Sequence, residues 1–424
     1  MLADINRIVS LAELDCVLNA VERNAHFDVR QASFSDQRDW RIENGALSHK
    51  TGGFFDVIGL RSERTGEERI ALFQPQSALT GLAITRMEDE VYVLVQARIE
   101  PGNSSGCQFG PTIQSTPANY LRLHGGKATP YAELFTRYNA RCRQLCVTSQ
   151  MDLGEFYYQK NKSHVYVEVM DPEPAENNFA WVSLKVLRLA LKRDNYLNND
   201  LRSLLIMFDW DRFVCGPSAL LATDSNFDVI GGVNRVADVG GAWGMTGLSD
   251  LQTMEWSEDG GFCLDGVSVA MFRTEAHTRE VNSWYQPLMF ADGVAQSVLI
   301  ISGCSRERRV LLSVLQEPGL SGGGAVGPSF VRRHCEQSWD IPAAGKVVRS
   351  FTQSDEGGRF YRQETLNQIV EVNDDWVTEE SQFWCTLAEL KQLFYTSQMV
   401  SFQLRAIASV LLAELNPVVL SEDG

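Results

Sequence analysis

The pattern of apolar residues along the chain predicts several strands. Segments 90–100 (EVYVLVQARIE) and 308–317 (RRVLLSVLQE) are rich in β-branched and apolar residues and are bounded by turn signals, which is typical of strands. Segments 164–170 (HVYVEVM) and 368–373 (QIVEVN) show the same pattern. A sheet therefore accounts for much of the predicted core.

Leucines at helical spacing follow a tryptophan in two segments, 181–207 and 384–410. In the second of these, Thr386 and Glu389 have the spacing of a capping box at a helix start. The N-terminal residues 1–29 carry a further amphipathic helix. Strands and helices together predict an α+β fold.

The two tryptophan-led segments are copies of one pattern. Trp181 lies 21 residues before Arg202, and Trp384 lies 21 residues before Arg405, so the two pairs share an offset of 203. Three shorter motifs recur in the same order: EPG at 100–102 and 317–319, GPT or GPS at 110–112 and 327–329, and QP at 74–75 and 286–287. Several motifs in one order predict a tandem duplication of a mixed-sheet domain.

This repeat predicts four parts of the chain. An N-terminal helical segment (1–29) precedes a first repeat (30–208). An inter-domain crossing (209–244), which overlaps a stretch rich in Gly and Asp, leads to a second repeat (245–424). The length of 424 residues allows two domains that each bury a core.

Composition narrows the class of protein. Apolar residues make up 44% of the chain and charged residues 22%, which is typical of a globular protein. The formal net charge of −16 argues against a general nucleic-acid binder, because phosphate attraction requires clustered Lys and Arg. A small anionic ligand stays possible, since a few local cations can hold a diphosphate.

The chain has no signal of a membrane or secreted protein. Its first residues lack the basic start and uninterrupted apolar core of a signal peptide, and no run approaches the roughly 20 apolar residues that span a bilayer. The nine cysteines are scattered, which fits reduced thiols and a cytoplasmic location. Cys142 and Cys146 could share a helix face, but no His or second Cys pair completes a metal site.

Residues 96–120 (QARIEPGNSSGCQFGPTIQSTPANY) form an unusual polar segment. It combines many amide, hydroxyl and carboxyl side chains with three prolines, at 101, 111 and 117. A simple connecting loop needs neither that hydrogen-bonding capacity nor that rigidity. The segment is therefore the first candidate for a binding site.

At this point the sequence resembles the NDP-hexose 2,3-dehydratases of deoxysugar biosynthesis, from about residue 30 to the end. The QP pairs, QARIEPGN and the tryptophan-to-arginine segments carry part of the resemblance. Three further motifs carry the rest: HKTGGFFDVIGL (49–60), GPTIQSTPANYLRLHGGK (110–127) and QSDEGGRFY (353–361).

The resemblance implies a fold, a reaction and partners. Each half is expected to be a Nudix-like domain, the two related by a pseudo-twofold axis, in a homodimer. The implied substrate is a nucleotide-linked 4-keto-6-deoxyhexose, usually a thymidine diphosphate sugar, which loses the 2-hydroxyl and the 3-hydrogen without a redox cofactor. A 3-ketoreductase is a possible downstream partner. Diphosphate hydrolysis is not expected, because the run of Glu residues that holds Mg²⁺ in that chemistry is absent from the sequence.

The two halves depart from the family pattern in complementary ways. The family's acidic Gly-containing loop is present at 353–361, but the first half reads TSQMDLGEF at 148–156. The polar segment is present at 110–120, but the second half reads GPSFVRRHCEQ at 327–337. We therefore expect one working pocket, built mainly by residues 96–127, and a second pocket that is relict or only binds. A composite pocket that pairs 96–127 with 353–361, within a subunit or across a dimer, is an alternative.

The chemistry of the implied reaction selects candidate residues. A ketone at C4 acidifies the C3 hydrogen, so the site needs a base, donors for the enolate oxygen, an acid for the leaving hydroxyl and cations for the diphosphate. The catalytic candidates are Glu100, Gln114, Tyr120 and His124. The substrate-binding candidates are His49, Asn103, Gln108, Thr112, Asn119, Lys127, Ser354, Glu356, Gly357 and Arg359.

Structural roles are the alternative for several of these residues. Glu100 recurs as Glu317, in the half without the polar segment, which favours a role in holding the Pro-Gly turn. Thr112 could cap the segment after it, and His49 could bind a backbone carbonyl.

Structural roles are also open elsewhere. Arg202 and Arg405 recur in both halves, which favours a buried salt bridge or dimer contact over phosphate binding. Residues 353–361 could be a tight turn with Gly357 and Gly358 at positive φ.

Two other functions fit the same sequence. One is a catalytically retired sugar-nucleotide binder that assists a ketoreductase or glycosyltransferase. The other is a related enzyme that eliminates or epimerises through the same enolate on another activated sugar.

Overall fold

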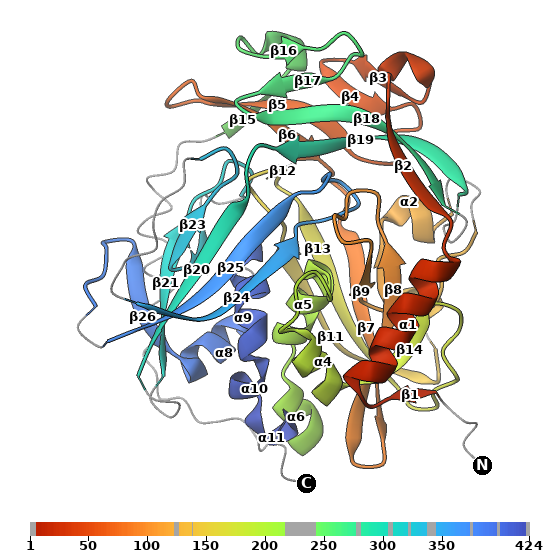
Figure 1. Cartoon of the computed structure of the whole chain (residues 1–424), viewed down its shortest axis with the longest axis vertical. Coiled ribbons are helices and arrows are strands. Elements are labelled where there is room, and N and C mark those ends of the chain that lie inside the picture. Colours follow the sequence, from red (N-terminus) through yellow and green to blue (C-terminus); the bar gives the residue numbers. More distant parts are fainter. Residues whose placement is uncertain are drawn as a thin grey trace.

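The computed structural model describes residues 6–122, 127–137, 139–216, 243–276, 281–303, 308–320, 324–336, 345–373, 376–396 and 399–420. Two large sheets stand side by side with helices between them, and two smaller sheets lie across one end (Figure 1). The chain is therefore a mixed α+β protein rich in strands.

The first large sheet has eight strands in the order β1-β14-β8-β7-β13-β11, with β9 on β8 and β10 on β7. Its only parallel pairs in the described chain are β7 with β13 and β1 with β14. The strands are β1 (Arg7–Ile8), β7 (Ala78–Met87), β8 (Glu90–Ile99), β9 (Cys107–Gly110), β10 (Ile113–Ser115), β11 (Cys142–Met151), β13 (Asn161–Val169) and β14 (Phe179–Ser183).

The second large sheet repeats this order. Its path β26-β21-β20-β25-β24 matches β14-β8-β7-β13-β11, with β22 on β21 and β23 on β20, and β20 is parallel to β25. The strands are β20 (Ala295–Ser302), β21 (Arg309–Leu315), β22 (Ala325–Pro328), β23 (Phe330–Arg332), β24 (Lys346–Ser354), β25 (Glu364–Val372) and β26 (Gln382–Thr386).

The two smaller sheets exchange a strand with each other. One has the order β12-β6-β5-β4-β3, and β15, from the later part of the chain, pairs with β5. The other has the order β16-β17-β18-β19, and β2, from the start of the chain, pairs with β18. The strands are β2 (Phe27–Ala32), β3 (Trp40–Glu43), β4 (Ala46–His49), β5 (Asp56–Ser62), β6 (Glu68–Phe73), β12 (Tyr157–Tyr158), β15 (Trp243–Thr246), β16 (Glu255–Trp256), β17 (Phe262–Leu264), β18 (Val267–Ala276) and β19 (Ser283–Ala291).

Helices fill the space between the large sheets, where α5 packs against α9, while α1 packs on β8 and β9 (Figure 1). A single apolar core joins both large sheets to these helices. The α-helices are α1 (Leu11–Asn24), α2 (Pro117–Tyr120), α3 (Glu133–Thr136), α4 (Leu184–Ala190), α5 (Asn199–Ile206), α6 (Trp210–Cys215), α8 (Leu387–Thr396), α9 (Phe402–Ala408), α10 (Leu412–Leu415) and α11 (Pro417–Leu420). The 3-10 helices of the described residues are η1 (Phe34–Asp36), η3 (Leu248–Asp250) and η4 (Ser409–Leu411).

The predicted elements are largely confirmed. The four segments with strand patterns are β8, β13, β21 and β25, and the capping box is present because Thr386 and Glu389 each accept from the other's backbone N–H. Trp181 and Trp384 lie in strands rather than in the helices, which begin three residues later at Leu184 and Leu387. Most of the predicted crossing, 217–242, lies outside the described residues.

The repeated arginines are buried, but they bind no carboxylate among the described residues. Arg202 Nε donates to Leu197 O (3.2 Å) and Gln353 Oε1 (2.9 Å). Arg405 Nη1 donates to Val400 O (2.5 Å), the counterpart of Leu197 O, and its Nη2 donates to Met151 O (2.6 Å). Burial lowers the pKa of Arg202 to about 9 and that of Arg405 to about 10. The predicted salt bridge is therefore wrong, because carbonyl groups supply the acceptors.

The two Pro-Gly turns (100–102 and 317–319) join the halves reciprocally. Gly102 N–H donates to Gly357 O (2.7 Å) and Arg362 N–H donates to Gly102 O (2.6 Å). In the same way Gly319 N–H donates to Gly154 O (2.8 Å). A Cβ on Gly102 would overlap the carbonyl oxygen of Phe360, so glycine is required by close approach of two backbones.

Gly102→Ala should therefore lower the free energy of unfolding by about 1–3 kcal/mol or more, because the added methyl group forces the two backbones apart. Denaturant unfolding measures this change. Gly244→Ala is the control, since the nearest atom to its added Cβ is 3.9 Å away. Equal stability of the two variants would contradict this description of the turn.

Candidate active site

A cavity of about 250 Å³ lies where the first large sheet meets the smaller sheets and the second half of the chain. It is called the first cavity below. Of the predicted site residues, seven border it: His49, Glu100, Gln114, Asn119, Lys127, Glu356 and Arg359. The Pro-Gly turn at 100–102 brings 353–361 to this cavity, so segments from both halves build its wall.

Other predicted residues lie beside this cavity. A smaller neighbouring pocket shares Glu100, Gln114 and Glu356 with it and adds Asn103, Gln108, Ser354 and Gly357. Gln108 Nε2 donates to Ser354 Oγ at 3.1 Å, which joins the two polar segments directly.

Three predicted residues are placed differently. The Thr112 hydroxyl donates to Leu94 O (2.5 Å) and accepts from Ala83 N–H (2.9 Å), so its proton is used between strands and a structural role is favoured. Tyr120 packs against the apolar cluster around Trp181 and does not border the cavity. His124 lies outside the described residues.

The predicted positive φ at Gly357 and Gly358 is wrong, since neither is among the positive-φ glycines of the described chain. Gly357 is needed for another reason, because a Cβ there would overlap the Asn103 side chain. This close packing holds Glu356 at its place in the cavity wall.

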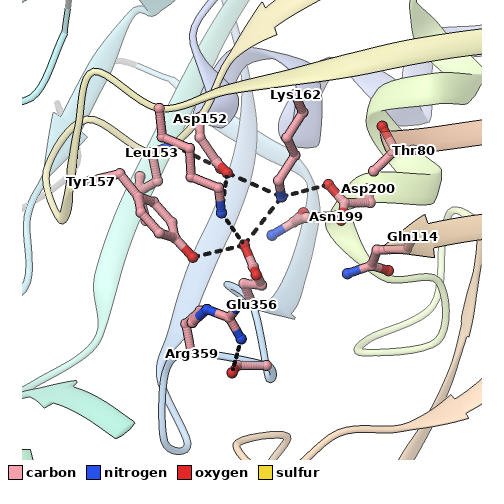
Figure 2. Close-up of polar contacts among 12 residues, drawn as sticks. Thr80, Gln114, Asp152, Leu153, Tyr157, Lys162, Asn199, Asp200, Glu356 and Arg359 are labelled. Atoms are coloured by element: carbon pink, nitrogen blue, oxygen red, sulfur yellow. Dashed lines mark hydrogen bonds and ion pairs between the residues drawn. The ribbon is translucent and has the colours of Figure 1, made fainter. Parts of the chain in front are cut away.

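Five charged residues form a group at the wall of the first cavity, and we call them the ion cluster: Asp152, Lys160, Lys162, Asp200 and Glu356. The first four are buried and Glu356 is 13% exposed; all but Asp152 border the cavity. Lys162 Nζ lies 2.8 Å from Asp200 Oδ1, 3.1 Å from Glu356 Oε2 and 3.2 Å from Asp152 Oδ2 (Figure 2). Lys160 Nζ lies 3.0 Å from Asp152 Oδ2 and 3.6 Å from Glu356 Oε2. The Tyr157 hydroxyl also donates to Glu356 Oε2, at 3.0 Å.

Electrostatics divides the roles within the ion cluster. Burial alone raises the pKa of Glu356, but the positive charges of Lys160, Lys162 and Arg359 outweigh it and hold the pKa well below a carboxyl's usual range. Burial lowers the pKa of Lys162, but three carboxylates raise it well above the usual range. For Lys160 the effect of burial is larger than that of the neighbouring carboxylates, and its pKa is lowered. Burial likewise raises the pKa of Asp200. Groups with pKa values displaced in opposite directions can exchange protons with a ligand.

The second half holds a counterpart of this cavity without the two lysines. The residue at the register position of Lys162 is Thr365, because Lys162 pairs with Ala78 on β7 and Thr365 pairs with Ala295 on β20. The halves are related by offsets of 203 and 217 residues, which place Gln363, Leu153, Gln403 and Val331 at the positions of Lys160, Glu356, Asp200 and Gln114. Leu153, Val331, Thr365 and Gln403 line a space of only about 10 Å³.

One acid of the ion cluster has a charged counterpart. Asp355 stands at the position of Asp152, lines the same small space and lies 3.6 Å from His334. The same backbone therefore folds without the two lysines, Asp200 and Glu356.

Aromatic and cationic residues line the outer part of the first cavity. Trp40, His49 and Phe54 contact one another, with ring centroids of His49 and Phe54 4.7 Å apart. His49 Nδ1 lies 2.8 Å from the Thr51 hydroxyl and accepts from Thr51 N–H at 3.3 Å. Arg359 lies over the Phe55 ring at 4.4 Å.

Sequence reasoning missed Lys160, Lys162, Asp152 and Asp200. The available signal was the alternation of Lys160 and Lys162 before an apolar strand, where two lysines on one side of a buried strand are unusual.

The described part of the chain contains no group of three or more His, Cys, Asp and Glu arranged to hold a metal ion. Its helices also include none that is long and apolar enough to cross a bilayer.

Lys162→Thr should lower the free energy of unfolding by about 3–5 kcal/mol, because it leaves buried carboxylates without their main partner. The fivefold variant Asp152→Asn, Lys160→Gln, Lys162→Thr, Asp200→Gln and Glu356→Leu removes every charge of the ion cluster and should recover most of that loss. Denaturant unfolding of both variants measures the difference. A fivefold variant no more stable than Lys162→Thr would show that the scaffold itself needs the charges.

Glu317, the counterpart of Glu100, gives a prediction of pH dependence. Burial raises its pKa from 4.5 to about 7, although its carboxylate accepts from Gln403 Nε2 at 2.6 Å. The folded state thus binds this proton more tightly than the unfolded state. Its contribution to stability is complete below pH 4.5 and is lost as the pH rises through about 7.

The loss amounts to at most about 3 kcal/mol of unfolding free energy. Glu317→Gln should remove this part of the pH dependence, measured by unfolding at a series of pH values. Glu258→Gln, at an exposed position, should retain it. An unchanged pH profile in Glu317→Gln would show that Glu317 is ionised throughout.

Comparison with known proteins places this site in a family. The family model described as NDP-hexose 2,3-dehydratase matches residues 11–208 and 250–411, and these two segments are in line with two parts of the chain. A dTDP-4-dehydro-6-deoxy-alpha-D-glucopyranose 2,3-dehydratase of Saccharopolyspora spinosa is 24% identical, covering 96% of this chain and 92% of the relative.

Two further relatives carry the same name. The protein of Streptomyces violaceoruber is 26% identical, covering 91% of this chain and 94% of the relative, and that of Amycolatopsis orientalis is 24% identical, covering 92% and 87%. The family model accounts for most of the chain on both sides of the undescribed crossing, so the chain belongs to the NDP-hexose 2,3-dehydratase family.

Proposed function

We propose that this chain is a carbon–oxygen lyase that removes water across C2 and C3 of a thymidine diphosphate-linked 4-keto-6-deoxyhexose. The observation that carries the proposal is the ion cluster at the end of a cavity in a chain of this family, since buried charges with displaced pKa values are typical of proton-transfer sites. The relatives named above supply the choice of sugar and nucleotide.

The reaction needs no electron acceptor outside the substrate. Removal of the C3 proton places charge on the C4 carbonyl oxygen, and expulsion of the protonated 2-hydroxyl regenerates that carbonyl and leaves an enol between C2 and C3. The enol then becomes a ketone at C3. The protein must move protons and stabilise the enolate oxygen, as preorganised donors do in other enzymes.

Gln114 is the best placed donor for the enolate oxygen. Its Oε1 accepts from Asn198 Nδ2 at 3.0 Å, so the amide orientation is fixed. No residue in the described ranges accepts from its Nε2, and Gln114 borders the first cavity. Asn119 is a second neutral donor on the same wall. The acid or base roles of Tyr120 and His124 stay predictions, since Tyr120 does not border the first cavity and His124 lies outside the described residues.

Cations at the cavity suit the diphosphate. Lys127 and Arg359 are the proposed ligands, and Arg98 lies on the same wall, 3.2 Å from Glu100 Oε1. Glu100 therefore orients a cation as well as bordering the cavity. His49, Asn103, Gln108, Ser354, Glu356 and Gly357 complete the proposed binding set around the sugar.

The proposal includes the organisation of the chain. We infer a tandem duplication of a Nudix-like domain, with parts at 1–29, 30–208, 209–244 and 245–424, and the shared strand order of the large sheets supports it. We propose one working cavity per chain, because the counterpart positions of Lys160, Lys162 and Glu356 carry Gln363, Thr365 and Leu153. A homodimer, a cytoplasmic location and a downstream 3-ketoreductase are further parts of the proposal.

Two other functions would use the same cavity: a retired sugar-nucleotide binder and an enzyme that epimerises through the enolate. Incubation with the thymidine diphosphate 4-keto-6-deoxyhexose in D₂O separates them by mass spectrometry. A dehydratase yields a product that has lost water. An epimerase exchanges the C3 hydrogen without loss of water, and a binder leaves the sugar unchanged; either result would contradict the proposal.

Gln114→Val installs the counterpart residue and should lower kcat by about 10²–10³-fold, because one donor to the enolate oxygen is removed. Thymidine diphosphate affinity, measured by calorimetry, should stay nearly unchanged, since the nucleotide does not contact this amide. Val331→Ala in the counterpart cavity is the control and should keep full turnover. A normal kcat of Gln114→Val would show that Gln114 does not donate to the enolate oxygen.

A further inference from the structure

We infer that Lys160 is the catalytic residue that takes the proton from C3 and delivers it to the departing 2-hydroxyl. The inference rests on the proposed function and adds the acid–base group that the family assignment leaves open. Three observations carry it: the contacts that distinguish Lys160 from Lys162, the residue at the counterpart position, and the place of Lys160 at the cavity wall.

The two lysines of the ion cluster differ in how many of their N–H groups are held. An ammonium group has three donors, and Lys162 directs them to Asp152, Asp200 and Glu356, all within 3.2 Å. Its proton is therefore retained, and it acts as a fixed positive charge. Such a group positions Glu356 but does not act as a base.

Lys160 has one close partner. Its Nζ lies 3.0 Å from Asp152 Oδ2, but 3.6 Å from Glu356, and its remaining side faces the Tyr157 ring at 3.7 Å from the centroid. Only 2% of the side chain is exposed, yet Lys160 borders the first cavity. A ligand in the first cavity would contact the side of Lys160 Nζ that has no close carboxylate. A reacting C–H of that ligand would then lie within reach of Nζ.

The second half shows that the scaffold does not need a lysine at this position. Gln363 stands one residue before β25, as Lys160 stands one residue before β13. Gln363 is buried as deeply as Lys160, since 4% of each whole residue is exposed. A buried charge is costly, so its presence in one half and absence from the other indicates a role in chemistry rather than in folding.

The surrounding groups favour a readily reversible proton on Lys160. Burial lowers its pKa, and Lys162 and Arg359 act in the same direction. The negative charges of Asp152 and Glu356 raise the pKa of Lys160 and so oppose this shift only in part. The Tyr157 hydroxyl donates a hydrogen bond to Glu356. Lys160 therefore reaches the neutral form more easily than an ordinary lysine, as a general base requires.

The step is balanced without an oxidant or reductant. Neutral Nζ forms a bond to the C3 proton, and the electrons of the C3–H bond move to the C4 carbonyl oxygen. The Lys160 ammonium, now facing Asp152 and Glu356, gives that proton to O2 as the C2–O2 bond breaks. Water leaves, the C4 carbonyl re-forms with a C2–C3 double bond, and Lys160 is neutral again.

Three variants test this role in the full chain with the thymidine diphosphate 4-keto-6-deoxyhexose. Lys160→Gln installs the counterpart residue, Lys160→Arg keeps the positive charge but cannot act as a base, and Lys185→Gln changes an exposed lysine as the control. Both Lys160 variants should lose about 10²–10⁴-fold in kcat and in C3 exchange with D₂O, and should still bind thymidine diphosphate. The control should match the wild-type protein.

Each result supports or overturns the inference. Activity of Lys160→Arg within tenfold of wild type would show a purely electrostatic role, and unchanged C3 exchange in Lys160→Gln would exclude Lys160 as the base. If the Lys160 variants do not fold, the wild-type protein decides, because its kcat/KM must rise with pH as Lys160 loses its proton; a flat or falling profile overturns the inference. A wild-type protein that neither exchanges C3 nor loses water contradicts the proposed function itself.

Discussion

The backbone contact between the Pro-Gly turn at 100–102 and residues 357–362 determines the shape of the site. Two backbones approach so closely at Gly102 that it cannot carry a side chain, and a Cβ on Gly357 would overlap the Asn103 side chain. Because of this contact, Glu356 from the second half reaches the lysines of β13 and its preceding turn in the first half. The cavity is thus composite, and its charge balance requires both halves.

The reciprocal contact, between the turn at 317–319 and residues 154–159, holds the same geometry without the two lysines and Glu356. There Leu153 replaces Glu356, Thr365 replaces Lys162, and the space is nearly closed. The second half therefore shows the scaffold without the site, and the first half shows the same scaffold with the site. Burial of five charges is unfavourable unless each is paired, and the pairing in the first half leaves Lys160 the least satisfied.

Much of the fold could be predicted from the sequence because strands and capping signals are local. The alternating apolar segments became β8, β13, β21 and β25, and the repeat offsets of 203 and 217 align the strands of the two large sheets. The exchange of β2 and β15 between the smaller sheets could not be predicted, since pairing over more than 180 residues leaves no periodic signal.

The candidate site could be predicted in part. Polar residues gathered between prolines pointed to Glu100, Gln114 and Asn119, and Glu356 and Arg359 followed from a Gly-rich motif. The lysines were missed because a lysine in a strand normally faces solvent, and only the tertiary contacts show that these two are buried. Arg202 and Arg405 were correctly expected to be buried, but local sequence does not show that carbonyl groups would be their acceptors.

The central claim is that the first cavity holds a sugar nucleotide with its hexose against the ion cluster. A crystal structure of the chain with thymidine diphosphate-linked 4-keto-6-deoxyhexose, or a stable analogue, tests this most directly. The account predicts density for one hexose per chain, with C3 next to Lys160 and the C4 oxygen next to Gln114. Nucleotide bound away from Gln114, Glu356 and Arg359, or a first cavity filled by side chains in the complex, would contradict it.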